Sequence, residues 1–367
     1  MTTVCSWTTS RRSIVYGLFA LSGATSLAYE VVWTRLLIRV FGATSVAVTT
    51  VLASWMAGLA LGSYLFGRLI DGTPTGGSAE EGPPRDTTAR ARWNQQNPWR
   101  HPIRIYGLLE LGIGVFALAV PLVLIGLNGL YGAVYRASGG HHDLLGMVRV
   151  GLGFVVLLIP TTLMGGTLPV LSRFVAGERT GLARRVGLLY AVNTFGAVAG
   201  AFASGYLLLP GLGLSRTTWL CVALNAAIFV VAAAVGRWPE YAEDSGPATQ
   251  GRSKPGRRAE TAAGKSRGPA DVPGDAYHAQ VGDLGARGRV VVLVAFMLTG
   301  FAALAAEVLW TRALALVIGT TVYAFSAMLV TFLLGLAAGS AVFSRVAGRV
   351  RRPRMTLGIV VAAVGVT

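Results

Sequence analysis

Two glutamates stand inside long apolar stretches of this sequence, and each begins the same short motif. The motif reads EVVWTR from Glu30 and EVLWTR from Glu307, so an arginine, Arg35 or Arg312, follows each acid by five positions. An ionisable side chain inside a membrane-spanning segment is costly, and it normally faces protein or water instead of lipid. The pattern therefore marks these four residues as the first candidates for chemistry.

The arginines are suitable partners for these acids, but not within one helix. A five-residue spacing places the two side chains about 140° apart on an ideal helix, so neither motif closes its own ion pair well. We expect crossed pairs, Glu30 with Arg312 and Glu307 with Arg35. Two interpretations are open: the pairs lock parts of the protein together, or they form a charged gate or a site for a cationic substrate.

A third acid, Glu110, lies in the apolar stretch GLLELGIG and has no cation near it in the sequence. Because it is close to the start of its segment, we expect either a solvated carboxylate or, if it is buried, a group that takes up and releases protons. Asn193, in YAVNTFG, can hydrogen-bond across helices, and a packing contact is its expected role.

Two prolines bracket the stretch TTLMGGTL at Pro160 and Pro169, with Gly165 and Gly166 between them. Proline removes a backbone donor and glycine tolerates unusual dihedral angles, so this pattern predicts a kinked or broken helix. Interrupted helices in transporters expose backbone groups to a cavity, which makes this segment a candidate cavity lining. A simple structural kink is the alternative.

The composition predicts an all-α polytopic membrane protein. Of 367 residues, 53% are hydrophobic and 13% are charged, which is more apolar surface than a soluble globule can bury. The net charge of +16 comes mainly from arginines in short clusters between apolar stretches, a distribution typical of membrane topology signals and not of a nucleic-acid surface. The pattern indicates a lipid bilayer as partner, and neither a metal site nor a cofactor in this chain.

Apolar runs of about 20 residues predict eight spanning helices and a partial ninth. Their approximate bounds are 14–40, 43–67, 103–127, 147–172, 186–209, 216–236, 289–317, 320–346 and 355 onward. The last run reaches Thr367 after about 13 residues, too few to cross a bilayer, so we expect the sequence to be a fragment. Arginines are concentrated in the even-numbered connections, which predicts a cytoplasmic N-terminus.

Three regions follow from this pattern. Residues 1–236 form a six-helix membrane half, residues 237–288 form a flexible basic linker on the cytoplasmic side, and residues 289–367 begin a second membrane half. The linker is rich in Gly, Ala, Pro, Ser and charge, and it cannot bury a core.

An internal repeat relates the two halves. At an offset of 277 residues, the segments 23–68 and 300–345 are identical at about 21 of 46 positions without a gap. Helices 1 and 2 are therefore repeated as helices 7 and 8. Because six helices separate the copies, both copies run in the same direction through the membrane, as in the parallel halves of major facilitator transporters. We expect a major-facilitator-like helix bundle.

The stretch GRLID at 67–71 resembles the cytoplasmic connection of major facilitators, where a Gly, Arg and Asp cluster latches the two halves. Arg68 recurs as Arg345 in the second copy, but the position equivalent to Asp71 is Gly348. The resemblance implies a cytoplasmic latch that is complete only in the first copy.

Several polar motifs together resemble the bacterial proteins described as fused major-facilitator and spermidine-synthase proteins. The matching stretches are SLAYEVVWTRLL with GLALGS, then IPTTLMGGTLPVLSR, then GLLYAVNTFGAVAGAFASGYLLLPGLGL, with AAEVLWTR and GLAAGS in the second copy. The resemblance covers most of the hydrophobic chain. It implies a multi-pass protein of the bacterial inner membrane.

In that family a cytoplasmic domain similar to the aminopropyltransferases, which make spermidine, follows the membrane helices. This chain contains no Gly-rich nucleotide loop between a strand and a helix, so no catalytic residue is expected within it. The resemblance implies an anchor or conduit for a transferase domain absent from this chain. The alternative is a transporter in its own right, for a polyamine or another small solute.

Overall fold

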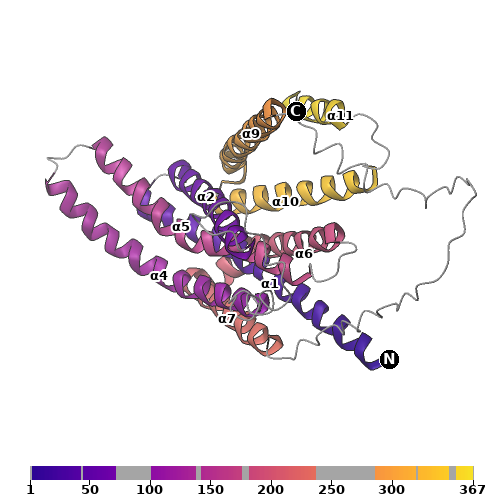
Figure 1. Cartoon of the computed structure of the whole chain (residues 1–367). Coiled ribbons are helices and arrows are strands. Elements are labelled where there is room, and N and C mark those ends of the chain that lie inside the picture. Colours follow the sequence, from indigo (N-terminus) through magenta and orange to yellow (C-terminus); the bar gives the residue numbers. More distant parts are fainter. Residues whose placement is uncertain are drawn as a thin grey trace, which may run out of the picture. The chain divides into compact units, whose positions relative to one another are not determined.

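The computed structural model of the chain is helical throughout the residues that it describes (Figure 1). These are residues 2–42, 44–71, 101–137, 142–175, 182–236, 286–319, 321–346 and 353–366, and they contain no strand. The elements are α1 (Thr2–Phe41), α2 (Thr44–Asp71), α4 (Pro102–Ala137), α5 (His142–Val175), α6 (Leu182–Ala203), the π-helix η2 (Ser204–Leu208), α7 (Leu209–Val235), α9 (Ala286–Ile318), α10 (Thr321–Val346) and α11 (Pro353–Val366).

The chain divides into two units. One comprises Met1–Trp238 together with Ala305–Thr367, and the other comprises Pro239–Leu304. The described part of the second unit is the first portion of α9, and most of the expected linker 237–288 lies outside the described residues. All contacts discussed below lie within the first unit.

Within the described ranges, seven helical stretches are long and apolar enough to cross a membrane, so the chain is an all-α, multi-pass membrane protein. The longest, Arg185–Val235, has 51 residues and contains Gly213, whose φ of 75° and ψ of 179° are not helical. Each side of Gly213 still has about 20 residues or more, enough for a membrane crossing. The break lies within the predicted connection between residues 209 and 216.

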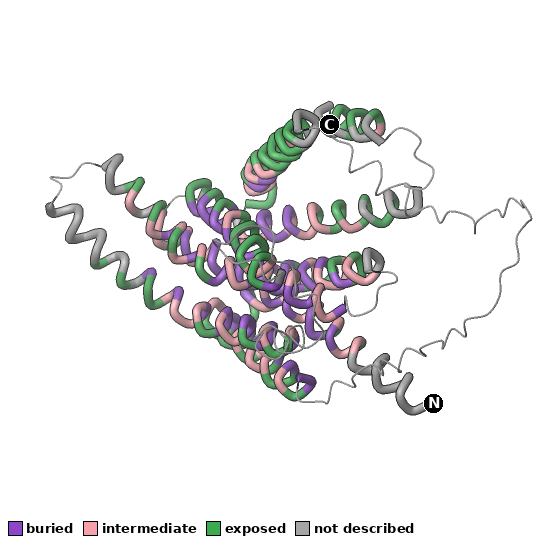
Figure 2. The backbone as a smooth tube through the Cα atoms, in the orientation of Figure 1, coloured by how far each residue is buried: buried purple, intermediate pink, exposed green. Residues whose placement is uncertain are grey.

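The burial pattern is that of a bundle in lipid. Large apolar side chains point outward, and Leu108 and Val115 of α4, for example, are 58% and 59% exposed. Figure 2 shows exposed residues along the outward faces of the helices and buried residues where the helices pack together. Lipid tails accept such apolar faces, which water would not.

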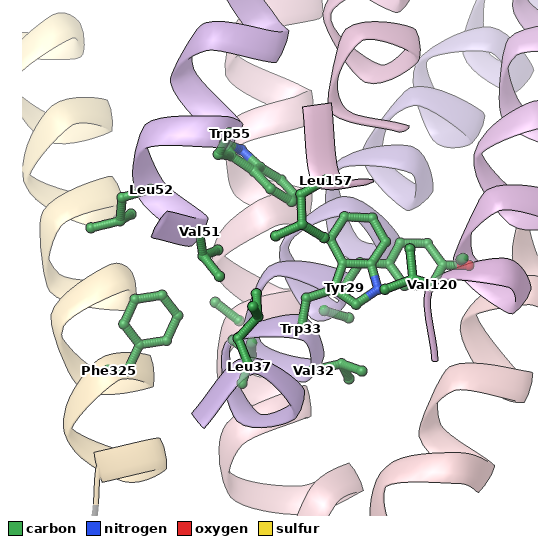
Figure 3. Close-up of a cluster of buried hydrophobic side chains, with 14 of the residues drawn as sticks. Tyr29, Val32, Trp33, Leu37, Val51, Leu52, Trp55, Val120, Leu157 and Phe325 are labelled. Atoms are coloured by element: carbon green, nitrogen blue, oxygen red, sulfur yellow. The ribbon is translucent and has the colours of Figure 1, made fainter. Parts of the chain in front are cut away.

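The core is built around α1, which contacts α2, α4, α5, α6, α7 and α10. Its two central aromatic side chains, Tyr29 and Trp33, stack with ring centroids 5.3 Å apart, and Trp33 meets Trp55 of α2 edge to face at 6.0 Å. Figure 3 shows this cluster, to which α5 contributes Leu157 and α10 contributes Phe325. Rigid aromatic packing of this kind fixes how α1 is rotated about its own axis.

Glycines allow helices to approach α1 and α2 at backbone contact. A Cβ atom at Gly196 or Gly200 of α6 would overlap the carbonyl groups of Ala20 and Ala24 in α1. Gly62 of α2 packs in the same way against the backbone of α5. Small residues in membrane helices permit this approach, which lets the backbones gain van der Waals contact.

Arginines cap the C-terminal ends of three helices. The last carbonyl groups of a helix have no partner within it, and they carry the negative end of the helix dipole. The bonds are Arg173 Nη1 to the Ile70 carbonyl of α2 (2.5 Å), Arg185 Nη1 to the Val175 carbonyl of α5 (3.3 Å) and Arg104 Nε to the Gly236 carbonyl after α7 (3.1 Å).

The two copies of the sequence repeat have equivalent helix ends. At the 277-residue offset, the end of α1 at Phe41 corresponds to the end of α9 at Ile318, and α2 and α10 both begin at a threonine. Between the helices, Gly42 has a φ of 71° and Gly319 a φ of 76°. Both donate their backbone N–H to a carbonyl four residues earlier. A positive φ requires glycine here, since other residues rarely adopt it.

Replacing Gly196 or Gly200 by alanine is expected to destabilise the protein, because each new methyl group would overlap the α1 backbone. The free energy of unfolding should fall by about 1–3 kcal/mol, as measured by thermal unfolding of the purified protein in detergent. Gly187→Ala, in the same helix but with nothing within 4 Å of the new Cβ, is the matched control and should be neutral or stabilising. Equal midpoints for all three variants would contradict this packing.

Candidate functional site

Every buried residue of formal charge in the described part of the chain is a glutamate. These are Glu30, Glu110 and Glu307, with exposed fractions of 2%, 0% and 1%. The buried residues described include no lysine, arginine or histidine. Burying a charge without a partner is among the most costly arrangements in a protein, so these three positions are the main functional candidates.

Glu30 of α1 and Glu307 of α9 lie within electrostatic range of each other. Between Ala305 and Ile318, only Glu307 and Thr311 of α9 are buried, and their four-residue spacing puts them on one helix face. Val308 of α9 packs against the hydrophobic cluster that contains Tyr29 and Trp33 of α1. The structure thus brings together the two acids that the repeat makes equivalent.

The threonines of the two motifs complete this site. Thr34 and Thr311 are equivalent in the repeat, and both are buried. Thr34 Oγ1 donates to the Glu30 carbonyl at 2.8 Å, whereas Thr311 Oγ1 and Glu307 Oε2 have no hydrogen-bond partner. We call Glu30, Thr34, Glu307 and Thr311 the acidic centre. Its unpaired oxygens are acceptors that a cationic donor would satisfy.

The arginines of the motifs lie elsewhere. Arg35 is half-buried and Arg312 is exposed, and neither forms an ion pair with Glu30 or Glu307 among the described residues. The crossed ion pairs expected from the sequence are therefore not observed. The physical reason is the helical spacing: the same five residues that keep Arg35 away from Glu30 also direct it away from the face that meets the acids.

A polar contact next to the core involves the π-helix η2, which the sequence does not predict. Gly205 of η2 lies so close to Ser326 of α10 that a Cβ atom would overlap the serine side chain. Ser326 Oγ is buried without a partner. Tyr206 donates its hydroxyl to the Tyr323 carbonyl at 3.2 Å, and the two rings stack at 5.4 Å. Short π-helices often occur at functional sites.

Glu110 of α4 is enclosed by two neighbouring helices, α1 and α7. Ser22 of α1 donates its hydroxyl to Glu110 Oε1 at 2.5 Å, and Asn225 of α7 donates its side-chain amide to the Glu110 carbonyl at 3.3 Å. The second carboxyl oxygen, Oε2, has no partner. The prediction of a solvated carboxylate at Glu110 is therefore wrong, because α1 and α7 cover this part of α4.

Of the kinked or broken helix expected at Pro160 and Pro169, the break is not present, since α5 continues through both prolines from His142 to Val175, and the kink stays a prediction. A proline removes the bond to the carbonyl four residues earlier, which for Pro169 is the Gly165 carbonyl. Ser63 of α2 donates its hydroxyl to that carbonyl at 3.1 Å. A neighbouring side chain thus replaces the missing donor and α5 continues.

The other residues of this segment pack against α2. A Cβ atom at Gly165 would overlap the backbone of Leu59, and one at Gly166 would overlap the ring of Phe66. Asn193 of α6 is half-buried against Gly23 of α1, whose added Cβ would overlap the asparagine carbonyl. Gly165 and Gly166 therefore lie at the contact of α5 with α2, and Asn193 lies at the contact of α6 with α1.

The predicted latch residues Arg68 and Asp71 lie in the last turn of α2. The Arg68 guanidinium lies 4.5 Å from the centre of the Tyr64 ring, and Asp71 is the last residue of α2. The side chains of Asp71 and Arg345 lie outside the described residues. The latch stays a prediction.

Comparison with known protein families, with curated proteins and with solved structures finds no match to this chain. Among the described residues, no group of three or more His, Cys, Asp and Glu side chains could hold a metal ion. The chemistry of the site therefore has to be argued from its own geometry.

A double-mutant cycle tests whether Glu30 and Arg312 are partners. Removing one member of a buried ion pair costs about 3–5 kcal/mol, and the two losses are strongly non-additive. Because the acid has no arginine partner here, Glu30→Gln should not lower the thermal midpoint, and its effect should add to that of Arg312→Gln within about 0.5 kcal/mol. If each single variant loses several kcal/mol of stability and the double variant loses little more than either one, the two residues form the crossed pair after all. The same cycle applies to Glu307 and Arg35.

Proposed function

We propose that this chain is the membrane region of a protein that carries a small organic cation, of the polyamine class, through the bacterial inner membrane. The observation that carries the proposal is the acidic centre: two buried glutamates, equivalent in the repeat, within electrostatic range of each other and without an arginine partner.

The chemistry of the centre favours a cation with more than one amino group. Two like charges that are buried near each other repel, and a positive group between them removes this cost. A primary ammonium group also offers three donors, which suits the unpaired Glu307 Oε2 and Thr311 Oγ1. A diamine brings two charges for two carboxylates.

The architecture supports transport in particular. Two helix pairs of equivalent sequence and equivalent helix ends supply one acid each, as in transporters built from parallel repeats with a site at the repeat interface. We therefore propose a major-facilitator-like bundle with a cytoplasmic N-terminus. The arginines that cap α2, α5 and α7 support this orientation, since all three connect helix ends that the positive-inside tendency places in the cytoplasm.

A second role rests on the motifs shared with the fused spermidine-synthase-like proteins. There the helices would also anchor a cytoplasmic aminopropyltransferase-like domain absent from this chain, and conduct its substrate or product. Assaying the natural reading frame that contains this chain for aminopropyl transfer to putrescine tests this role. Transfer by the full-length protein is the expected result, and an intact nucleotide loop without activity would contradict it.

Uptake of radiolabelled putrescine and spermidine into liposomes that contain the purified full-length protein, from the natural reading frame that contains this chain, tests the transport proposal. Wild-type protein should take up both solutes down their gradient. Glu30→Gln and Glu307→Gln should each reduce uptake by about tenfold or more, because a hydrogen bond to a charged group contributes about 1.5–3 kcal/mol.

Glu260→Gln is the matched control, since it makes the same chemical change in the hydrophilic segment 237–288, and it should leave uptake unchanged. Wild-type uptake no faster than that of protein-free liposomes would overturn the proposal. So would equal uptake by the wild type and both acidic-centre variants.

A further inference from the structure

We propose that Glu110 is a proton-binding site, separate from the acidic centre, whose protonation drives movement of the solute. The inference rests on the proposed transport function for its role, but the site itself is argued from the geometry around Glu110. Proton binding converts the carboxylate to a neutral carboxyl group, with the proton on one oxygen and no other bond made or broken.

The site is closed and polar. Glu110 Oε1 accepts from Ser22 of α1, and the Glu110 carbonyl accepts from Asn225 of α7, so two neighbouring helices hold the residue in place. Both partners are themselves buried. Tyr106, one turn earlier in α4, donates its hydroxyl to the Leu18 carbonyl of α1 at 3.1 Å and so ties α4 to α1 beside the acid.

Several polar atoms in this region have no partner. They are Glu110 Oε2, Asn225 Oδ1 and the Tyr29 hydroxyl, which lies within electrostatic range of Glu110. An unpaired buried polar atom is costly and requires an explanation. A proton on Oε2 gives the carboxyl group a donor of its own, which an unpaired acceptor in the same region can use.

A proton fits this site better than a metal ion does. Hard divalent cations take about six or more oxygen ligands, and the described surroundings of Glu110 provide far fewer unpaired oxygens. The titratable groups near the carboxyl are Tyr29 of α1 and Tyr106 of α4, and Cys221 of α7 lies near Tyr29. No lysine, arginine or histidine among the described residues of α1, α4, α5 or α7 is buried, so no cation there compensates a charged Glu110.

The helix α1 links the proton site to the acidic centre. Tyr29 belongs to the face toward α4 and α7, while Glu30, the next residue, is rotated by about 100° around the helix. Both faces are tightly packed, so a shift of α1 that follows protonation of Glu110 also moves Glu30. This gives the two sites a mechanical connection without a shared ligand.

Two liposome assays together test the proposal. One measures accumulation of solute driven by a proton gradient, and the other measures solute counterflow. Counterflow needs solute binding but no net proton movement. Glu110→Gln should retain counterflow of putrescine and lose at least about tenfold of the accumulation driven by an imposed pH gradient, whereas Glu30→Gln should lose both. Glu110→Asp, which keeps an ionisable carboxyl, should retain part of the accumulation, and Glu260→Gln is the control.

Accumulation by Glu110→Gln equal to that of the wild type would overturn the proposal, as would accumulation driven by a sodium gradient and not by a pH gradient. A second readout does not depend on transport: infrared difference spectra of the purified protein between acidic and basic pH should contain a carboxylic acid band that is missing in Glu110→Gln. Identical difference spectra for the two proteins would also overturn the site, whether or not the chain transports a polyamine.

Discussion

The constraint on which this structure depends is the cost of placing charge in an apolar bundle. Arginines meet it at the helix ends, where Arg104, Arg173 and Arg185 reach carbonyl groups that would otherwise lack partners. Glutamates are the charged residues of the interior, where the Ser22 hydroxyl replaces water at one carboxyl oxygen of Glu110 and the other oxygen has no partner. The interior therefore holds acceptors in excess of donors, which is the condition for attracting protons and organic cations.

The central helix α1 makes this arrangement possible. Glycines of α6 bring its backbone into direct contact with Ala20 and Ala24, and the aromatic stack of Tyr29 and Trp33 fixes its rotation. Because α1 is packed on several faces, neighbouring residues of this helix can serve different sites. Rigid packing of the surroundings is what keeps unpaired polar atoms from collapsing onto alternative partners.

Much of the helical layout could be predicted from the sequence, since apolar runs of about 20 residues mark membrane helices and the repeat marks equivalent turns. Which face of each helix is buried could not be predicted, because segments that are apolar all round have no periodic contrast between buried and lipid-facing positions. One hydroxyl, from Ser63 of α2, satisfies the Gly165 carbonyl that Pro169 leaves without a donor, and the neighbour of Glu30 depends on how α9 packs. Such facts arise from tertiary contacts that no single segment encodes.

The π-helix η2 changes the phase of the helix that contains it. A π turn holds one more residue than an α turn, so every side chain after it is rotated by about 100° relative to an uninterrupted α-helix. Gly196 and Gly200 before the turn face α1, and Gly205 and Tyr206 within it face α10. The same helix thus packs against α1 through Gly196 and Gly200 and against α10 through Gly205 and Tyr206.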